Sequence, residues 1–364
     1  MLYAAFVRLP TEKAHGAQIV RTCEALARQG MAVVLAIPGR KTSIAQDVFE
    51  YYGAERTFAV VSLPVADLVG LGRIGFLWSS LLFACRISRR AKAQGSDCIY
   101  SRDKTVLVAL NLLSRVPLVW EIHGSEPLWA LRILSRAKFV AITAGIRDDL
   151  VARGVPPQSI CVAHDGIDLD SFADTEPQGV ARSRLGIPLG RKTVMYIGRL
   201  DGWKGTGTLL EASELLPDDV QVAIIGGEQE QVKWLRSRYP HVLFLGFLPY
   251  RDIARNEAAA DVLVLPNTAK DITSLKYTSP LKLFAYMASG VPMVVSDLPS
   301  LREIISEKEA FLIEPDNAQT LAGAIMAALK APDAQERARR AKERVAEYTW
   351  DKRAERIVKH VSHV

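Results

Sequence analysis

Short apolar segments alternate with helical patterns along the whole sequence, and this alternation limits the possible folds more than any other feature. Strand, helix and strand in regular succession are typical of βαβ units, which build mainly parallel sheets. The strands predicted in the first half are Leu2–Val7, Ala32–Ile37, Phe58–Leu63, Asp97–Tyr100, Pro117–Ile122, Phe139–Ile142 and Ile160–Ala163. Those predicted in the second half are Thr193–Ile197, Gln221–Ile225, Val242–Leu245, Val262–Leu265, Met293–Val295 and Phe311–Ile313. The fold class is therefore α/β.

A polar stretch, Ala173–Arg191, separates the two runs of strands and is rich in proline and glycine, as linkers are. A chain of 364 residues has room for two domains of ordinary size. We expect a first domain over 1–174, a second over 175–346 and a C-terminal helix over 347–364. Trp350 lies on the apolar stripe of that helix, so we expect the helix to pack on the first domain.

The overall composition is that of a globular protein, with 49% hydrophobic and 24% charged residues. A net charge of +6 suits an anionic ligand or a membrane surface, but no basic cluster with interleaved aromatics indicates nucleic acid. No apolar run is long enough to span a membrane, and the N-terminus lacks the pattern of a signal peptide. The four cysteines have neither metal-ligand nor disulfide-framework spacing. We expect a cytoplasmic protein with reduced cysteines.

Polar residues follow two predicted strands of the first half. Ser101, Arg102 and Asp103 follow one strand, and Glu121 and His123 lie at the end of another. In open parallel sheets the ligand crevice lies outside the carboxyl ends of the strands. A histidine there can hydrogen-bond a sugar hydroxyl or a phosphate, although a purely structural role is the alternative.

Gly16 lies where the loop after the first strand joins a helix. A glycine there lets a ligand approach the backbone, with the start of the helix behind it. An ordinary turn glycine is the alternative.

The first strand of the second half runs into the sequence GRLDGWKG, which contains Arg199 and Lys204. Two cations and a glycine-rich backbone at a strand end suit a diphosphate, although a solvated charged turn is the alternative. The next strand ends at Gly226 and Gly227, where a planar base can approach the chain. Gly246-Phe247-Leu248, after the following strand, can supply backbone contacts to the edge of the base.

The stretch from Lys276 to Arg302 predicts a loop, a short helix and a buried strand. Ser279 is a good N-cap, Pro280 suits the first helical position, and Gly290 ends the helix. Free backbone N–H groups at such a helix start form a site for a phosphate, although a capped surface helix is the alternative. Leu283 and Met287 form the apolar face, and Lys282, Ala285, Tyr286 and Ser289 form the opposite, more polar stripe.

Val69–Gln94 carries a broad apolar face that includes Phe76 and Trp78, and basic residues crowd its end. We expect most of this helix to be buried. Contact with a membrane interface is the alternative.

With these residues assembled, the chain resembles the retaining GT-B glycosyltransferases of family 4 over nearly its whole length. The resemblance is carried by PTEKAHGAQ, EIHG, HDGIDLDSF, GRLDGWKG, the glycine-pair strand ends and SPLKLFAYMASGVPMVVSD. It implies two Rossmann-like domains facing a cleft, with the acceptor on the first and the nucleotide sugar held mainly by the second. It also implies transfer of a sugar from a nucleotide diphosphate sugar, UDP- or GDP-linked, to an acceptor hydroxyl with retention of configuration.

The resemblance also assigns roles to residues. Those matching catalytic positions are His123, Arg199 and Lys204. Those matching nucleotide-binding positions are Gly16, Gly226, Gly227, Phe247, Leu248, Ser279, Pro280, Leu281, Lys282 and Ala285. We predict no metal and no cofactor beyond the donor. The expected partners are the donor and a sugar- or lipid-linked acceptor of polysaccharide or glycoconjugate synthesis, with peripheral contact at the inner face of the membrane.

The chain departs from the family at the two positions where glutamates are usual, which are Tyr277 and Ala285 here. The second glutamate commonly contacts the nucleotide ribose, and alanine cannot. Three explanations are open: a substitution of the glutamate, another way of holding the ribose, or lost activity. A nucleotide-sugar 2-epimerase of the same fold and a catalytically silent nucleotide-sugar-binding protein are therefore the alternative functions.

Overall fold

The chain folds into two compact units in a computed structural model that describes residues 1–42 and 44–362. The first unit takes in Met1–Asp165 and the C-terminal segment from Trp350, and the second takes in Gly166–Thr349. The first unit thus ends nine residues before the predicted boundary at 174. The reason is that Ile167 and Phe172 belong to the core of the second unit, so that unit begins before the polar stretch. The last two residues of the predicted C-terminal segment, 363 and 364, lie outside the described residues.

The sheet of the first unit has, in the described part of the chain, seven parallel strands in the order β3-β2-β1-β4-β5-β6-β7. Their bounds are β1 Leu2–Ala4, β2 Val34–Pro38, β3 Ala59–Leu63, β4 Ile99–Ser101, β5 Leu118–Ile122, β6 Lys138–Ala141 and β7 Ile160–Val162. The helices are α1 Ala14–Arg28, α2 Val48–Tyr52, α3 Gly72–Ala93, α4 Lys104–Leu113, α5 Leu128–Ile133, α6 Ala144–Ala152 and α15 Trp350–Val361. All seven strands predicted from the sequence are present, with ends displaced by a few residues.

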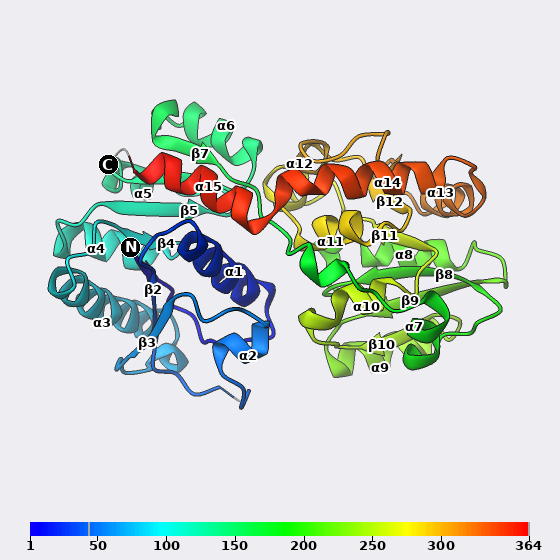
Figure 1. The fold of residues 1–364 in the computed structure, drawn as a ribbon, viewed down its shortest axis with the longest axis horizontal. Helices are drawn as coiled ribbons and strands as arrows, with labels where there is room; N and C mark the ends of the chain where they lie inside the picture. The colour runs from blue at the N-terminus through cyan, green and yellow to red at the C-terminus, as the bar shows by residue number, and fades with distance from the viewer. Residues whose placement is uncertain (43, 363–364) are drawn as a thin grey trace. The chain divides into compact units, whose positions relative to one another are not determined.

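The second unit repeats this plan with six parallel strands, within the described residues, in the order β10-β9-β8-β11-β12-β13. They are β8 Lys192–Ile197, β9 Val220–Ile225, β10 Leu243–Gly246, β11 Val262–Leu265, β12 Met293–Ser296 and β13 Phe311–Ile313. The helices are α7 Gln178–Leu185, α8 Thr206–Ser213, α9 Gln229–Arg238, α10 Ile253–Glu257, α11 Leu281–Ser289, α12 Pro299–Arg302, α13 Ala318–Lys330 and α14 Ala334–Arg344. Figure 1 shows helices on both faces of each sheet, so each unit is a doubly wound, Rossmann-like layer structure.

The strand order reverses once in each unit, between β1 and β4 in the first and between β8 and β11 in the second. Such a reversal opens a crevice outside the carboxyl ends of the strands, where doubly wound proteins bind ligands. Gly16 and Arg102 follow β1 and β4, and Arg199 and Lys204 follow β8. Gly16, Arg199 and Lys204 therefore come after strands that flank the reversals, whereas His123 follows β5 and the glycine pair follows β9.

The burial predicted for α3 is wrong for much of its apolar surface. Ile74 and Trp78 are 71% and 56% exposed, and the large side chains at 71, 77, 81 and 82 are exposed as well. The buried side of the helix instead contains Gly75, Ser79, Phe83 and Ile87, four residues apart along one stripe, with Ser80, Ala84 and Ala91 beside them. Because the first two of these are small, the helix packs on the unit with a narrow face and leaves the larger apolar side chains outside.

The C-terminal helix α15 belongs to the first unit, as predicted, and packs against α1 and β7. Figure 1 shows it, in red, beside the blue α1. Trp350, Ile357 and Val361 are buried on its inner stripe, and so is Arg353. Among the described helices, none is both long enough and apolar enough to cross a membrane.

Candidate functional site

The loop after β8 carries two of the predicted cations in different surroundings. The guanidinium of Arg199 is 61% exposed and lies 3.1 Å from the carboxylate of Asp201. The ammonium of Lys204 lies 3.4 Å from the ring centre of Trp203. Burial lowers the pKa of Lys204 to about 8, Asp201 opposes this shift and Arg199 adds to it.

A buried lysine at the start of α11 reaches the same loop. Lys282 Nζ donates to the hydroxyl of Tyr196 at 3.0 Å, and that hydroxyl donates to the carbonyl of Arg199 at 2.7 Å. Burial lowers the pKa of Lys282 well below its usual value, and the nearby charge of Lys204 lowers it further. Within the described chain, no carboxylate lies at ion-pair distance from Lys204 or Lys282. The two amino groups therefore form a site that an anion would charge, and neither has a carboxylate of the described chain in ion-pair contact.

The helix α11 begins one residue later than predicted. Pro280 has an extended backbone and is the N-cap, so the helix begins at Leu281 and Ser279 lies just outside it. The N-cap residue provides no side-chain cap, and Leu283 N–H donates to the carbonyl of Pro280, so the N–H groups of Leu281 and Lys282 are the ones that an anion at this helix start would meet. Gly290 ends the helix in the left-handed conformation with φ 71°, as predicted.

The predicted polar stripe of α11 is wrong, because the helix is buried nearly all round. It packs against α10 and α14, and the ring of Phe284 stacks on that of Tyr348. Ala285 is 0% exposed and belongs to the main apolar core of the second unit. Tyr277, at the other departure from the family pattern, is buried as well.

The two glycines after β9 allow this segment to lie close against the loop that follows β8. A Cβ atom on Gly226, where φ is 121°, would lie 2.1 Å from the carbonyl oxygen of Gly198. A Cβ atom on Gly227 would clash with the side chain of Leu200. Both glycines are therefore needed to hold the loop that follows β8. Phe247 is exposed and Leu248 is partly buried after β10, where the base contacts were predicted.

In the first unit, Gly16 lies in the first turn of α1, close to the predicted position. A Cβ atom on it would lie 2.0 Å from the hydroxyl of Tyr52, which bonds to the backbone of Thr11. This side of Gly16 is thus filled by protein, and the packing of Tyr52 explains why a glycine is needed.

His123 belongs to a buried cluster at the carboxyl end of β5. Its Nε2 lies 2.5 Å from Glu121 Oε1, which also accepts from Gln18 Nε2 at 2.6 Å. Glu121 Oε2 accepts from the Tyr100 hydroxyl and lies 2.8 Å from Arg353 Nη2. We call these five residues the Glu121 cluster.

The two titratable groups at the centre of this cluster are shifted. Burial alone would raise the pKa of Glu121, but Arg353, His123 and Arg102 hold it well below its usual range. Burial lowers the pKa of His123, Arg102 adds to the shift, and Glu121 opposes it. His123 keeps 22% of its side chain exposed, so the ring is open to a ligand. At neutral pH the cluster offers a neutral imidazole held by an ionised carboxylate.

Sequence reasoning missed Tyr196, Gln18, Tyr100 and Arg353 as members of these two sites. The signal for Arg353 was present, because it falls on the apolar stripe of α15 between Trp350 and Ile357. A charged residue on such a stripe indicates a buried partner. The others are strand or helix residues whose importance depends on long-range contacts.

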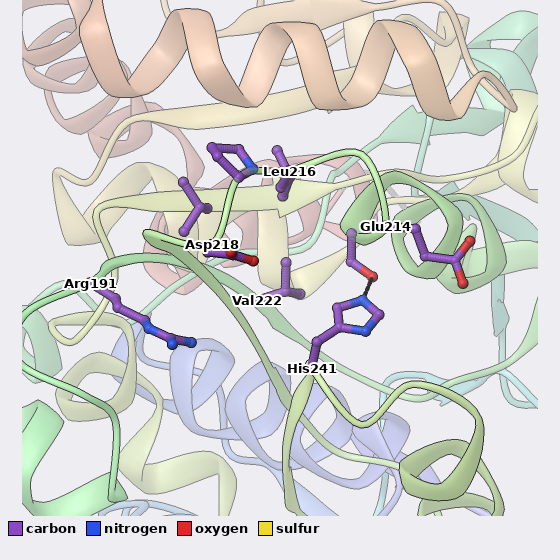
Figure 2. Close-up of a pocket in the computed structure, with 9 residues that line it drawn as sticks. Arg191, Glu214, Leu216, Asp218, Val222 and His241 are labelled. Atoms are coloured by element: carbon purple, nitrogen blue, oxygen red, sulfur yellow. Dashed lines mark hydrogen bonds between the residues drawn. The ribbon is translucent and has the colours of Figure 1, made fainter.

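A pocket of about 330 Å3 lies elsewhere in the second unit (Figure 2). It opens beside Arg191 and Val220, at the amino ends of β8 and β9, and the ring of His241 bonds to Ser213 at its wall. It is therefore at the sheet edge opposite to Lys204. Among the described residues, no group of three or more histidine, cysteine, aspartate or glutamate side chains is arranged to hold a metal ion.

Comparison with known proteins gives two family matches and many relatives. Residues 16–171 match the family described as Glycosyltransferase Family 4, and residues 191–331 match Glycosyl transferases group 1. Phosphatidyl-myo-inositol mannosyltransferase of Mycobacterium leprae is 33% identical over 209 residues, which cover 54% of this chain and 51% of that protein. The chain thus spans about half the length of curated relatives such as this one.

Solved structures match over the full length. Sucrose-phosphate synthase from Thermosynechococcus elongatus gives a TM-score of 0.80 at 20% identity, covering 100% of this chain and 98% of that one. Anabaena HepE in complex with UDP-glucose gives a TM-score of 0.77 at 20% identity and covers both chains fully. These likenesses establish the GT-B fold, and with the two family matches they show that this chain belongs to the GT-B glycosyltransferases of family 4.

Proposed function

We propose that this chain transfers a sugar from a nucleotide diphosphate sugar to an acceptor hydroxyl, with retention of configuration, in polysaccharide or glycoconjugate synthesis. The observation that carries the proposal is the pair of lysines in the second unit, Lys204 and Lys282, which have no carboxylate at ion-pair distance among the described residues and lie near the start of α11. Desolvated cations and helix N–H groups are the partners that a diphosphate takes. The protein's net charge of +6 also favours an anionic substrate.

The chemical role proposed for this site is stabilisation of the departing diphosphate. Lys204 and Lys282 neutralise the negative charge that develops as the bond to the sugar breaks, and the N–H groups at the start of α11 add hydrogen bonds. Arg199 joins them when its guanidinium leaves Asp201, an exchange that its exposed position permits. Because these groups carry the charge, we propose that turnover needs no metal ion.

We assign the remaining contacts with the nucleotide sugar to the residues predicted from the sequence. Gly226, Gly227, Phe247 and Leu248 border the base, which is that of UDP or GDP. Ser279, Pro280 and Leu281 border the diphosphate where α11 begins. Gly16 and His123, from the first unit, act on the phosphates and the transferred sugar, respectively. Ala285 leaves the ribose without a carboxylate, and we propose that nucleotide binding is weaker for this reason.

We further propose that the first unit docks on an anionic membrane surface to reach a lipid-linked acceptor. Consecutive helices α3, α4 and α5 are in contact, and each exposes large apolar side chains such as Trp78, Leu112 and Trp129. The charged residues of these three helices are all basic. Apolar side chains next to cations are the chemistry that binds the interface of an anionic bilayer. We propose that this contact is made at the inner face of the membrane.

The test of the activity is a panel of UDP-, GDP- and ADP-sugars, first as thermal-shift ligands and then as donors with extracted lipid acceptors. The proposal predicts stabilisation by one nucleotide class, release of that nucleoside diphosphate only with acceptor present, and turnover in chelator. Release of an epimerised nucleotide sugar without acceptor would identify the 2-epimerase alternative. Stabilisation without turnover, in this chain and in Ala285→Glu, would identify the silent binding protein.

A further inference from the structure

We propose that Arg353, carried into the first unit by α15, is the positioning residue that fixes the ring of His123 through the carboxylate of Glu121. This inference rests on the proposed function, because it explains how the histidine proposed to act on the transferred sugar is oriented. Arg353 does not touch the ring itself: its polar contacts go to Glu121, to Asp165 and to the carbonyls of residues 163 and 164.

The geometry around Glu121 leaves the carboxylate no freedom. Gln18 and His123 bond to Oε1, Tyr100 donates to Oε2, and Arg353 Nη2 lies 2.8 Å from Oε2 as an ion pair. Three hydrogen bonds and one ion pair therefore hold the two oxygens. Gln18 is itself held, because its amide oxygen accepts from Arg102 at 3.0 Å. A carboxylate fixed from four sides gives the imidazole one direction in which to point.

Arg353 is as firmly held as the carboxylate it pairs with. Its side chain is 1% exposed, and its guanidinium donates to the carbonyls of Ala163 and His164 after β7. Asp165 Oδ1 lies 3.7 Å away, farther than Glu121. Helix α15 therefore brings a permanent positive charge next to Glu121, the carboxylate that holds the ring of His123. Arg353 and Glu121 are 232 positions apart in the sequence, by the difference of their residue numbers.

The charge of Arg353 determines which nitrogen of His123 meets a ligand. An ionised Glu121 requires a hydrogen on Nε2, so a neutral ring presents Nδ1 with its lone pair. The ring then accepts a hydrogen bond from a substrate hydroxyl. Without the arginine, the buried carboxylate has lost its main counter-charge, and the Glu121–His123 pair takes up a proton at higher pH.

Other charged groups around the ring come from every element packed against it, and they are unchanged in the variants below. They are Tyr3 on β1, His15 on α1, Tyr100 and Arg102 at the end of β4, and Asp165 after β7. A shift between the wild type and a variant of Arg353 therefore reports the charge of Arg353, acting through Glu121 and, more weakly, through Asp165.

The direct test is NMR titration of the His123 imidazole in 15N-histidine-labelled protein, assigned with His123→Gln. The wild type is expected to show hydrogen on Nε2 and a pKa below the ordinary 6.5. Arg353→Met is expected to raise the apparent pKa of the pair by about one unit or more, a tenfold gain in proton affinity. Arg353→Lys, which keeps the charge, and Lys359→Met, an exposed cation on the same helix, should leave it near the wild-type value.

A second readout uses turnover. The acidic limb of kcat against pH should move up by the same amount in Arg353→Met, while KM for the donor changes little. A merely structural arginine would lower stability and leave both the limb and the titration in place, which would overturn the proposal. If Arg353→Met does not fold, the wild type decides: a Glu121 carboxyl carbon that titrates near the ordinary 4.5 would equally overturn it. The titrations need no substrate, so absence of glycosyl transfer would refute the proposed function and leave this inference standing.

Discussion

Lys282 Nζ lies 3.0 Å from the hydroxyl of Tyr196 and 4.1 Å from the centre of its ring. The lysine belongs to the first turn of α11 and the tyrosine to β8, so this contact ties the start of the helix to the loop that carries Lys204. Since the tyrosine hydroxyl is a neutral partner, nothing in this contact offsets the lowered pKa of Lys282, and a bound anion would favour the charged form of the lysine. The predictions for the second unit follow from this arrangement.

Nucleotide binding should weaken as the pH rises through about 8. The pKa of Lys204 is lowered to about 8 by burial, so free protein loses this charge above that pH, and a bound diphosphate restores it. Calorimetry with UDP or GDP at pH 7 and pH 9 should show lower affinity and proton uptake at pH 9. Lys204→Met should bind weakly at both values. Equal affinity of the wild type at the two pH values would contradict this assignment.

Gly226→Ala should loosen the loop after β8. The new methyl would collide with the carbonyl of Gly198 at a positive φ, which costs about 1–3 kcal/mol in strain alone. Thermal unfolding should show a lower Tm, and nucleotide binding should fall with it. Gly323→Ala is the control, since that glycine lies inside α13 with nothing within 4 Å, and it should be neutral or slightly stabilising. A fully stable Gly226→Ala would refute the close approach.

Ala285→Glu tests the ribose position with two measurements. In the free protein, a carboxylate replacing this buried methyl enters the apolar core and should lower the Tm. If it reaches the ribose, it should tighten nucleotide binding by ~1.5–3 kcal/mol, or roughly ten- to 150-fold. Calorimetry at one pH decides, and unchanged affinity in a folded variant would refute the proposal for this position.

The membrane proposal predicts flotation of the protein with anionic vesicles and its loss in an Ile74→Ala, Trp78→Ala variant. The two side chains are exposed on α3, so their removal leaves the fold intact. Binding should also weaken with salt, because the basic residues act over a Debye length. The matched control is Trp234→Ala, an exposed tryptophan on α9 of the second unit. Equal flotation of the wild type and the α3 variant would contradict the proposal.

Trp350→Ala should destabilise the first unit by about 3–5 kcal/mol, because the indole is buried where α15 begins. The expected signs are a lower midpoint in urea and faster proteolysis of the C-terminal segment. Trp234→Ala serves again as the control for loss of an exposed indole. Unchanged proteolysis in the Trp350 variant would mean that this side chain does not anchor the helix.

Most of the fold could be predicted from the sequence, because each strand is a short apolar run that helical patterns separate from the next. The exposed face of α3 could not, since burial depends on which side of a helix the rest of the unit covers, and Gly75 and Ser79 form that side. The first residue of α11 was predicted one position too early, because Pro280 has an extended backbone and does not belong to the helix.

In the two candidate sites, too, some residues could be predicted from the sequence and others could not. Lys204 and His123 were found because they follow predicted strands, where ligands of parallel sheets bind. The roles of Tyr196 and Arg353 rest on contacts across 86 and 232 positions, taken as the differences between their numbers and those of Lys282 and Glu121. No local pattern identifies the partners in these contacts, although the position of Arg353 on the apolar stripe of α15 indicates that it is buried. The polar face of α11 was predicted from residue spacing alone. That prediction was wrong because other helices cover both sides of α11.

The most direct test of the central claim compares the affinity for a nucleoside diphosphate with that for its monophosphate, in the wild type, Lys204→Met and Lys282→Met. If the two lysines hold the diphosphate, calorimetry should show clear preference for UDP over UMP, or for GDP over GMP, in the wild type. That preference should largely disappear in each variant, with the Tm retained. An undiminished preference in both folded variants would contradict the account.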